Sequence, residues 1–138
     1  MKDIEISVPE HLVRRLNKAQ EILETASINV SQWQLGGGSA LEMMMHHRKS
    51  EDIDIFAFNP YIVSMMSPRL NDAIDCSEYI ESAACTKLIF DDYQIDFICA
   101  SNMTDCELLK HDVGDGTHIY IEHPLEVISK KYSIALHH

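Results

Sequence analysis

The chain has 138 residues, 46% of them hydrophobic, and a formal net charge of −11 at pH 7. This length suits a single domain over residues 1–138 with a modest core. The acidic balance argues against broad, nonspecific nucleic-acid binding, because that binding depends on basic side chains. The sequence has no apolar run near the roughly 18 residues of a membrane span and no secretory leader. We therefore expect a cytoplasmic protein without a membrane partner.

The first third of the chain alternates between helical and strand-like patterns. Apolar residues recur at helical spacing over residues 8–25, which predicts an amphipathic helix. A short, partly apolar segment over 29–35 predicts the first core strand, with Trp33 as a packing residue. A second helix is predicted over 39–46, and a strand over 52–56.

The middle of the chain predicts a short helix and a group of strands. The helix covers residues 61–66, and strand-like runs follow at 77–81, 84–90 and 93–99. A tight polar turn at Asp91-Asp92 separates the last two runs, which predicts a β-hairpin.

The last third begins with a polar, glycine-containing stretch over 102–116, which predicts a surface loop or short helix. Residues 118–122 alternate in polarity and predict the final strand. A helix then opens at His123-Pro124, with the proline in its first turn. Its apolar stripe consists of Leu125, Ile128, Tyr132, Ala135 and Leu136.

Two acids lie one residue apart on the strand predicted over 52–56. Alternation places Ile53 and Ile55 on one face and the acids Asp52 and Asp54 on the other. Two residues of strand rise roughly 6.6 Å, so both carboxylates could contact one hard cation, or two cations about 4 Å apart. Burying two anions side by side without a cation would be costly.

Three glycines, Gly36, Gly37 and Gly38, follow an apolar run and precede the helix predicted over 39–46. A glycine-rich turn into a helix N-terminus presents backbone N–H groups to an anion, usually a phosphate. Ser39 can cap that helix or contact the phosphate through its hydroxyl.

Other charged residues have two interpretations each. Asp96 is an acid in an otherwise apolar strand, and it is either a site residue or an exposed acid on an edge strand. Arg48 leads into the acidic strand, where it could reach a triphosphate or form a salt bridge that fixes the loop.

The ordered set of motifs resembles a known signature. Gly37-Gly38-Ser39-Ala40-Leu41, His47-Arg48 and the segment 50–56 (SEDIDIF) are similar to the DNA polymerase β-like nucleotidyltransferase superfamily, and more closely to its AbiEii/AbiGii-type family. A lone GGS or DxD would be weak, but the ordered set is fairly specific. The resemblance spans roughly residues 30–132 and implies an α+β nucleotidyltransferase fold, a small mixed sheet flanked by helices.

The resemblance also implies a function and a site. It implies an enzyme that moves an NMP from an NTP to a hydroxyl acceptor, either RNA such as tRNA or a protein. Asp52, Asp54 and Asp96 would be the catalytic and metal-binding residues, for two Mg²⁺ ions or Mn²⁺. The nucleotide-binding residues would be Gly37, Gly38, Ser39, Arg48 and Lys131, the last matching a family lysine on the final helix. A toxin–antitoxin or phage-defence role, with an antitoxin partner, is a further implication.

One departure and two alternatives accompany this interpretation. The family's downstream Arg and Asp are missing because the chain stops at His137-His138, so we expect a C-terminal extension to be lacking. A non-catalytic nucleotide-binding scaffold on the same fold is the first alternative. A metal-dependent phosphodiesterase is the second, although the glycine turn suits a triphosphate better than a diester.

Overall fold

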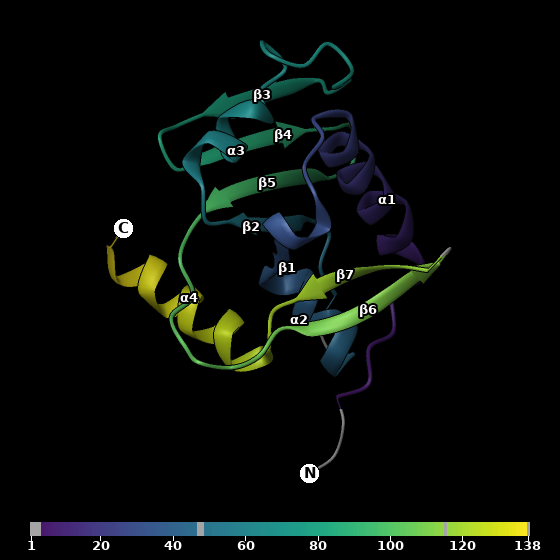
Figure 1. Ribbon diagram of the computed structural model, residues 1–138, viewed down its shortest axis with the longest axis vertical. Coiled ribbons are helices and arrows are strands. Elements are labelled where there is room, and N and C mark those ends of the chain that lie inside the picture. Colours follow the sequence, from purple (N-terminus) through teal and green to yellow (C-terminus); the bar gives the residue numbers. More distant parts are fainter. Residues whose placement is uncertain (1–3, 47–48, 115, 138) are drawn as a thin grey trace.

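Over the residues that the computed structural model describes, 4–46, 49–114 and 116–137, seven strands form one mixed sheet with helices on both faces (Figure 1). The strands stand in the order β3-β4-β5-β2-β1-β7-β6. β2 and β5 run parallel, as do β1 and β7, and the other neighbours are antiparallel. The strand bounds are β1 Gln34–Gly36, β2 Ile53–Ala57, β3 Glu78–Glu81, β4 Cys85–Ile89, β5 Gln94–Cys99, β6 Leu109–Gly114 and β7 Thr117–Ile121. The α+β class with a mixed sheet is therefore confirmed.

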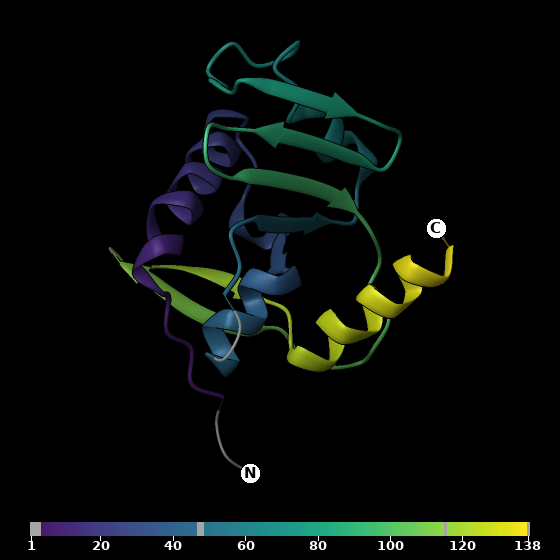
Figure 2. The same cartoon turned by 180° about the vertical axis from the view of Figure 1, so that it is seen from behind.

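The helices divide between the two faces of the sheet. They are α1 Glu10–Thr25, α2 Gly37–Met45, α3 Pro60–Met65 and α4 Pro124–His137, with a short 3-10 helix, η1, at Val30–Gln32. α1 and α3 cover one face, and α2 and α4 lie on the other (Figures 1 and 2). On this second face, β3, β4 and β5 carry no helix in the described part of the chain (Figure 2). None of the described helices combines the length and apolar character that a bilayer span requires.

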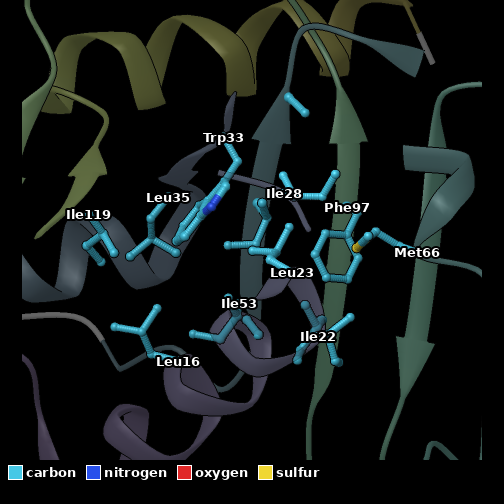
Figure 3. Close-up of a cluster of buried hydrophobic side chains, with 14 of the residues drawn as sticks. Leu16, Ile22, Leu23, Ile28, Trp33, Leu35, Ile53, Met66, Phe97 and Ile119 are labelled. Atoms are coloured by element: carbon cyan, nitrogen blue, oxygen red, sulfur yellow. The ribbon is translucent and has the colours of Figure 1, made fainter. Parts of the chain in front are cut away.

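The hydrophobic core lies between α1 and the sheet (Figure 3). Leu16 and Leu23 come from the apolar side of α1, and Ile53 and Phe97 come from β2 and β5; all are at most 3% exposed. Trp33 is buried in the same cluster, as its predicted packing role requires. Because side chains alternate along a strand, burial of Ile53 and Phe97 on this face sends Asp54 and Asp96 to the opposite face.

Two predictions of secondary structure, one of a strand and one of a loop or short helix, need correction. Residues 30–32 form η1 instead of part of a strand, because Asn29 and Gln32 cap the turn reciprocally: Ser31 N donates to Asn29 Oδ1 and Asn29 N donates to Gln32 Oε1. The polar stretch predicted to be a loop or short helix contains β6, which pairs with β7 in a hairpin. Hydrogen bonding to β7 gives this segment a strand structure that its polar composition did not indicate.

The apolar stripe of α4 faces away from the sheet. Leu125, Ile128 and Tyr132 are 56%, 40% and 68% exposed, whereas Glu126 and Lys130 on the inward side are 2% and 3% exposed. The inward side of α4 is thus largely charged, and these charges are paired within the fold.

Candidate active site

Asp54 and Asp96 are register partners on the parallel strands β2 and β5. The register continues on both sides, because Gly36 of β1 pairs with Asp54 and Lys87 of β4 pairs with Asp96. A single row across the sheet therefore holds a glycine, two carboxylates and an ammonium. Asp54 and Asp96 are 42 residues apart in sequence, and strand pairing brings them side by side.

Asp52 lies one residue before β2 and is exposed. Its Oδ1 accepts a hydrogen bond from the backbone N–H of Gln94 at 3.2 Å. The side chain of Gln94 in turn donates to Oδ1 of Asp96 at 3.2 Å. Gln94 therefore links the carboxylates of Asp52 and Asp96 at the start of the two strands.

The loop that leads into β2 is anchored to the helices by Glu42, a buried residue of α2. Oε1 of Glu42 accepts a hydrogen bond from the backbone N–H of Ser50, and Glu42 Oε2 lies 3.0 Å from His11 Nε2. Nη1 of Arg15 donates to the carbonyl of Glu51 at 2.5 Å. These contacts fix the approach to the acidic strand, and pattern analysis of the sequence did not identify them.

The two carboxylates of the row have raised pKa values. Burial raises the pKa of Asp54 to about 7, and the charges of Asp96, Asp52 and Glu122 add to the effect. Burial also raises the pKa of Asp96, while the ammonium of Lys87 acts in the opposite direction. A raised pKa means that the ionised carboxylates are poorly compensated by the protein alone.

The donor set fits a hard cation such as Mg²⁺, because Asp54 and Asp96 offer carboxylate oxygens from adjacent strands. A bound cation would also favour the ionised form of Asp54, whose pKa is raised mainly by burial and further by neighbouring acids. Within the described residues, however, no three His, Cys, Asp or Glu side chains are gathered closely enough to hold a metal ion. The two-ion site with Asp52, Asp54 and Asp96 stays a prediction.

The glycine turn lies directly against the acids. Gly37 has a φ of +65°, and a Cβ built on it would collide with the carboxylate of Asp54. A Cβ on Gly38 would instead meet only Ser50, whose Oγ would be 3.3 Å away. The close approach of Gly37 to Asp54 places the N-terminus of α2, where backbone N–H groups can bind an anion, beside the Asp54 carboxylate.

Ser39 does not cap α2, and that expectation is wrong. The helix begins at Gly37, so Gly36 is the capping residue and makes no side-chain hydrogen bond. Ser39 is inside the first turn, 1% exposed, and its Oγ donates to the Gly36 carbonyl at 3.3 Å. Its contact with a phosphate stays a prediction.

Of the two basic residues predicted to bind the nucleotide, Arg48 and Lys131, the structure describes only one. Arg48 lies outside the residues that the structure describes. Lys131 is exposed and lines a cavity of about 250 Å³ that also reaches Gly37, Gly38 and Asp54. Lys131 is therefore close to the glycine turn, although its role toward phosphates is not tested by this placement.

Beside this cavity is a cluster of buried polar side chains that the sequence patterns did not predict. Lys130 forms an ion pair with Glu122 Oε2, and its Nζ lies 3.5 Å from Glu126 Oε2. Nε2 of Gln34 donates to Glu122 Oε2 at 2.6 Å and to Asn102 Oδ1 at 2.8 Å. Glu122 is 0% exposed and Lys130 is 3% exposed, so the pair is shielded from water.

One signal could have revealed part of this cluster. Glu126 and Lys130 are four residues apart on one helix, a spacing at which opposite charges pair. The i,i+4 pattern alone usually indicates an exposed face. Burial of the pair follows from the packing of α4 against α2, and the Lys130 ammonium lies 4.6 Å from the ring centroid of Phe56.

A larger hollow, of about 530 Å³, lies elsewhere, between α1 and the turn that joins β4 to β5. Its walls mix basic residues such as Arg14 and Lys18 with acids such as Glu21 and Asp75. Asp52, Asp54, Asp96 and the glycine turn do not contribute to it. The candidate active site is therefore assigned to the smaller cavity, because Gly37, Gly38 and Asp54 line it.

No family model and no curated protein matches this chain. Among solved structures, it is similar to the CD-NTase CdnG of Bradyrhizobium diazoefficiens in complex with GTP, at 16% sequence identity and a TM-score of 0.48. The match covers 91% of this chain and 42% of that chain, so this chain spans less than half the length of that protein. Likeness at this level does not establish a family, and the AbiEii/AbiGii resemblance of the motifs stays a prediction.

Proposed function

We propose that this protein is a metal-dependent nucleotidyltransferase that moves an NMP group from an NTP to a hydroxyl acceptor. The observation that carries the proposal is the pairing of Asp54 with Asp96, with Gly37 packed directly against Asp54. A phosphate on the glycine turn would lie beside two carboxylates, and hard cations commonly bind carboxylates and substrate phosphates together. Such a site supplies positioning and charge neutralisation, the main contributions a protein makes to this kind of transfer.

The triphosphate is assigned to the N-terminus of α2. This helix has nine residues, and the N–H groups of its first residues, Gly37, Gly38 and Ser39, are proposed to bind the phosphates at that end. Lys131, at the edge of the cavity, is proposed to contact the phosphates. Arg48 is proposed for the same role on the basis of the motif resemblance.

Asp54 and Asp96, with Asp52 beside them, are the residues proposed to hold Mg²⁺ or Mn²⁺. When bound, the ions neutralise phosphate charge and polarise the phosphoryl oxygens. The raised pKa of Asp54 supports this assignment, because the carboxylate lacks full compensation within the protein.

The transfer itself is an in-line displacement. The acceptor oxygen forms a bond to the α-phosphorus as the bond between that phosphorus and the bridging oxygen of the β-phosphate breaks, and pyrophosphate leaves. The Asp96 carboxylate is proposed to take the proton of the acceptor hydroxyl. Asp96 is on β5, which carries no helix on this face in the described part of the chain (Figure 2), so an acceptor can approach from that side.

The acceptor is proposed to be an RNA, such as tRNA, or a protein. Either would fit a toxin–antitoxin or phage-defence role with an antitoxin partner, as the motif resemblance implies. The net charge of −11 favours an acceptor recognised locally at the site over one held by a broad basic surface.

A non-catalytic nucleotide-binding protein is the second candidate, and one observation favours it. The described residues do not gather three metal-binding side chains, and Asp52 is engaged by the backbone of Gln94. A nucleotide could then bind at the glycine turn without being turned over.

The deciding experiment incubates the protein with each α-labelled NTP, Mg²⁺ and either total RNA or a protein extract. We expect label in one acceptor fraction, and its loss in Asp54→Asn and Asp96→Asn. Asp105→Asn, which changes an exposed acid on the chain between β5 and β6, is the matched control and should transfer normally. Unchanged transfer by Asp54→Asn would contradict the proposal, and NTP binding without any transfer would support the non-catalytic candidate.

A further inference from the structure

Glu122 carries a buried oxygen without a partner. Both of its hydrogen-bond donors, Lys130 Nζ and Gln34 Nε2, contact Oε2. Oε1 is shielded from water and makes no hydrogen bond in the described part of the chain. Because unsatisfied buried acceptors are rare and costly, this one suggests a donor that arrives with a ligand.

Glu122 is one of the residues that line the cavity beside the glycine turn. Oε1 of Glu122 lies next to Gly36, where an added Cβ would be only 2.5 Å from it. Gly36 immediately precedes the proposed phosphate-binding turn, so the oxygen and the turn belong to one site.

The walls of this cavity are chemically divided. Gly37, Gly38 and Asp54 contribute polar groups to its lining, whereas Leu41 and Val127 contribute apolar side chains. At about 250 Å³, the cavity is smaller than pockets that enclose a drug-sized molecule, which measure about 300–1,000 Å³. It therefore suits one part of a ligand whose anionic part is bound on the glycine turn that lines it.

We propose that this cavity holds the nucleoside part of the nucleotide and that Glu122 Oε1 accepts a hydrogen bond from it. The inference rests on the proposed function, since the phosphates must occupy the glycine turn. The donor is an N–H of the base or an O–H of the sugar, both of which suit a carboxylate acceptor. Lys130 and Gln34 act as positioning residues, because they occupy Oε2 and leave Oε1 for the ligand.

This contact makes Glu122 a specificity-determining residue. A nucleotide without the matching donor would leave Oε1 buried and unpaired, and sites of this kind discriminate strongly against such analogues. We expect at least a tenfold weaker affinity for that analogue.

The cavity is tested by filling it. Leu41→Trp and, independently, Val127→Phe place larger side chains in the walls, and Leu125→Trp adds the same bulk at an exposed position of α4 as a control. Affinities for the NTPs and for inorganic tripolyphosphate are measured by calorimetry. We expect either filling variant to weaken NTP binding at least tenfold, with tripolyphosphate binding and the control unchanged. Unchanged NTP affinity in folded filling variants would overturn the inference.

The hydrogen bond is tested with nucleotide analogues. Deoxynucleotides lacking the 2′- or 3′-hydroxyl probe the sugar, and ITP compared with GTP, or purine riboside triphosphate compared with ATP, probes the exocyclic amino group. One of these changes should weaken binding to the wild type tenfold, and Glu122→Gln should remove that discrimination. Equal affinities of the wild type for all these analogues would refute the role of Glu122.

The two proposals fail in different ways. Label transfer that persists in folded Leu41→Trp with unchanged KM would refute the nucleoside cavity alone. Nucleotide binding that responds to Leu41→Trp, in a protein that transfers nothing, would refute the enzyme alone.

Discussion

Gly37 packs so closely on Asp54 that the carboxylate occupies the space where any side chain on residue 37 would begin. Gly37 also has a φ of +65°, in the left-handed region that favours glycine. Two independent constraints therefore fix the same residue. The contact joins the N-terminus of α2 to Asp54 of β2, so the anion-binding and cation-binding parts of the proposed site lie directly against each other.

Replacing Gly37 with alanine is expected to strain the fold. The backbone conformation alone costs roughly 1–2 kcal/mol for a residue with a Cβ, and the collision with Asp54 adds to it. We expect Gly37→Ala to lower the free energy of unfolding by about 2–4 kcal/mol, measured by urea denaturation. Gly38→Ala is the control, because its Cβ meets only the Ser50 side chain and a helical alanine is favourable. Similar losses in both variants would contradict the special role of residue 37.

Asp54 should make stability depend on pH. Its pKa is raised from 3.8 to about 7, so the unfolded chain releases this proton at lower pH than the folded chain does. Stability contributed by the protonated form is therefore fully present below about pH 4 and is lost as pH rises toward 7. We expect Asp54→Asn to raise Tm by roughly 5 °C at pH 8 and to change it little at pH 4. A Tm gain that is equal at both pH values would argue against titration of Asp54.

Mg²⁺ should lower the raised pKa of Asp54 in the wild type. A cation bound between Asp54 and Asp96 favours their ionised forms, so the pKa of Asp54 should fall. The measurement is the ¹³C chemical shift of the carboxyl carbon, followed by NMR through a pH titration with and without Mg²⁺. Asp105, exposed on the chain between β5 and β6, serves as an internal control. An Asp54 titration curve that does not move with Mg²⁺ would count against the metal site.

The adjacent lysines of α4 should behave differently. Lys130→Met leaves Glu122 as a buried charge without its cation, which is expected to cost about 3–5 kcal/mol of stability. Lys131→Met, at an exposed position, should change stability by less than about 0.5 kcal/mol and raise the KM for NTP. Urea denaturation and steady-state kinetics separate the two effects.

A double variant gives the control for the lysine prediction. Glu122→Gln combined with Lys130→Met removes both charges of the pair, so much of the stability lost in Lys130→Met should return. Further loss in the double variant would show that the ion pair is not the source of the effect.

Several features follow from local sequence. Alternation in IDIF places Asp54 opposite Ile53 and Ile55, because successive side chains of a strand point to opposite faces. The glycine run before an apolar helix indicated the turn, since glycine alone tolerates close approach and positive φ without strain. The helical spacing of α1 was equally clear and predicted its position to within two residues at its start and correctly at its end.

Other features depended on partners distant in sequence. Residues 109–114 form a strand because they pair with β7. Residues 30–32 form a 3-10 helix because a reciprocal cap between Asn29 and Gln32 competes with strand formation. In both segments composition was misleading, because a strand takes much of its stability from its neighbour.

The sequence by itself determined which side chains share a face and where a phosphate-binding turn was expected, since those properties follow from backbone periodicity. Only the tertiary structure decided that Asp96 stands beside Asp54 and that Lys130, and not Lys131, enters the fold beside Glu122. Strand register and helix rotation depend on packing between segments tens of residues apart, and no local pattern specifies that packing.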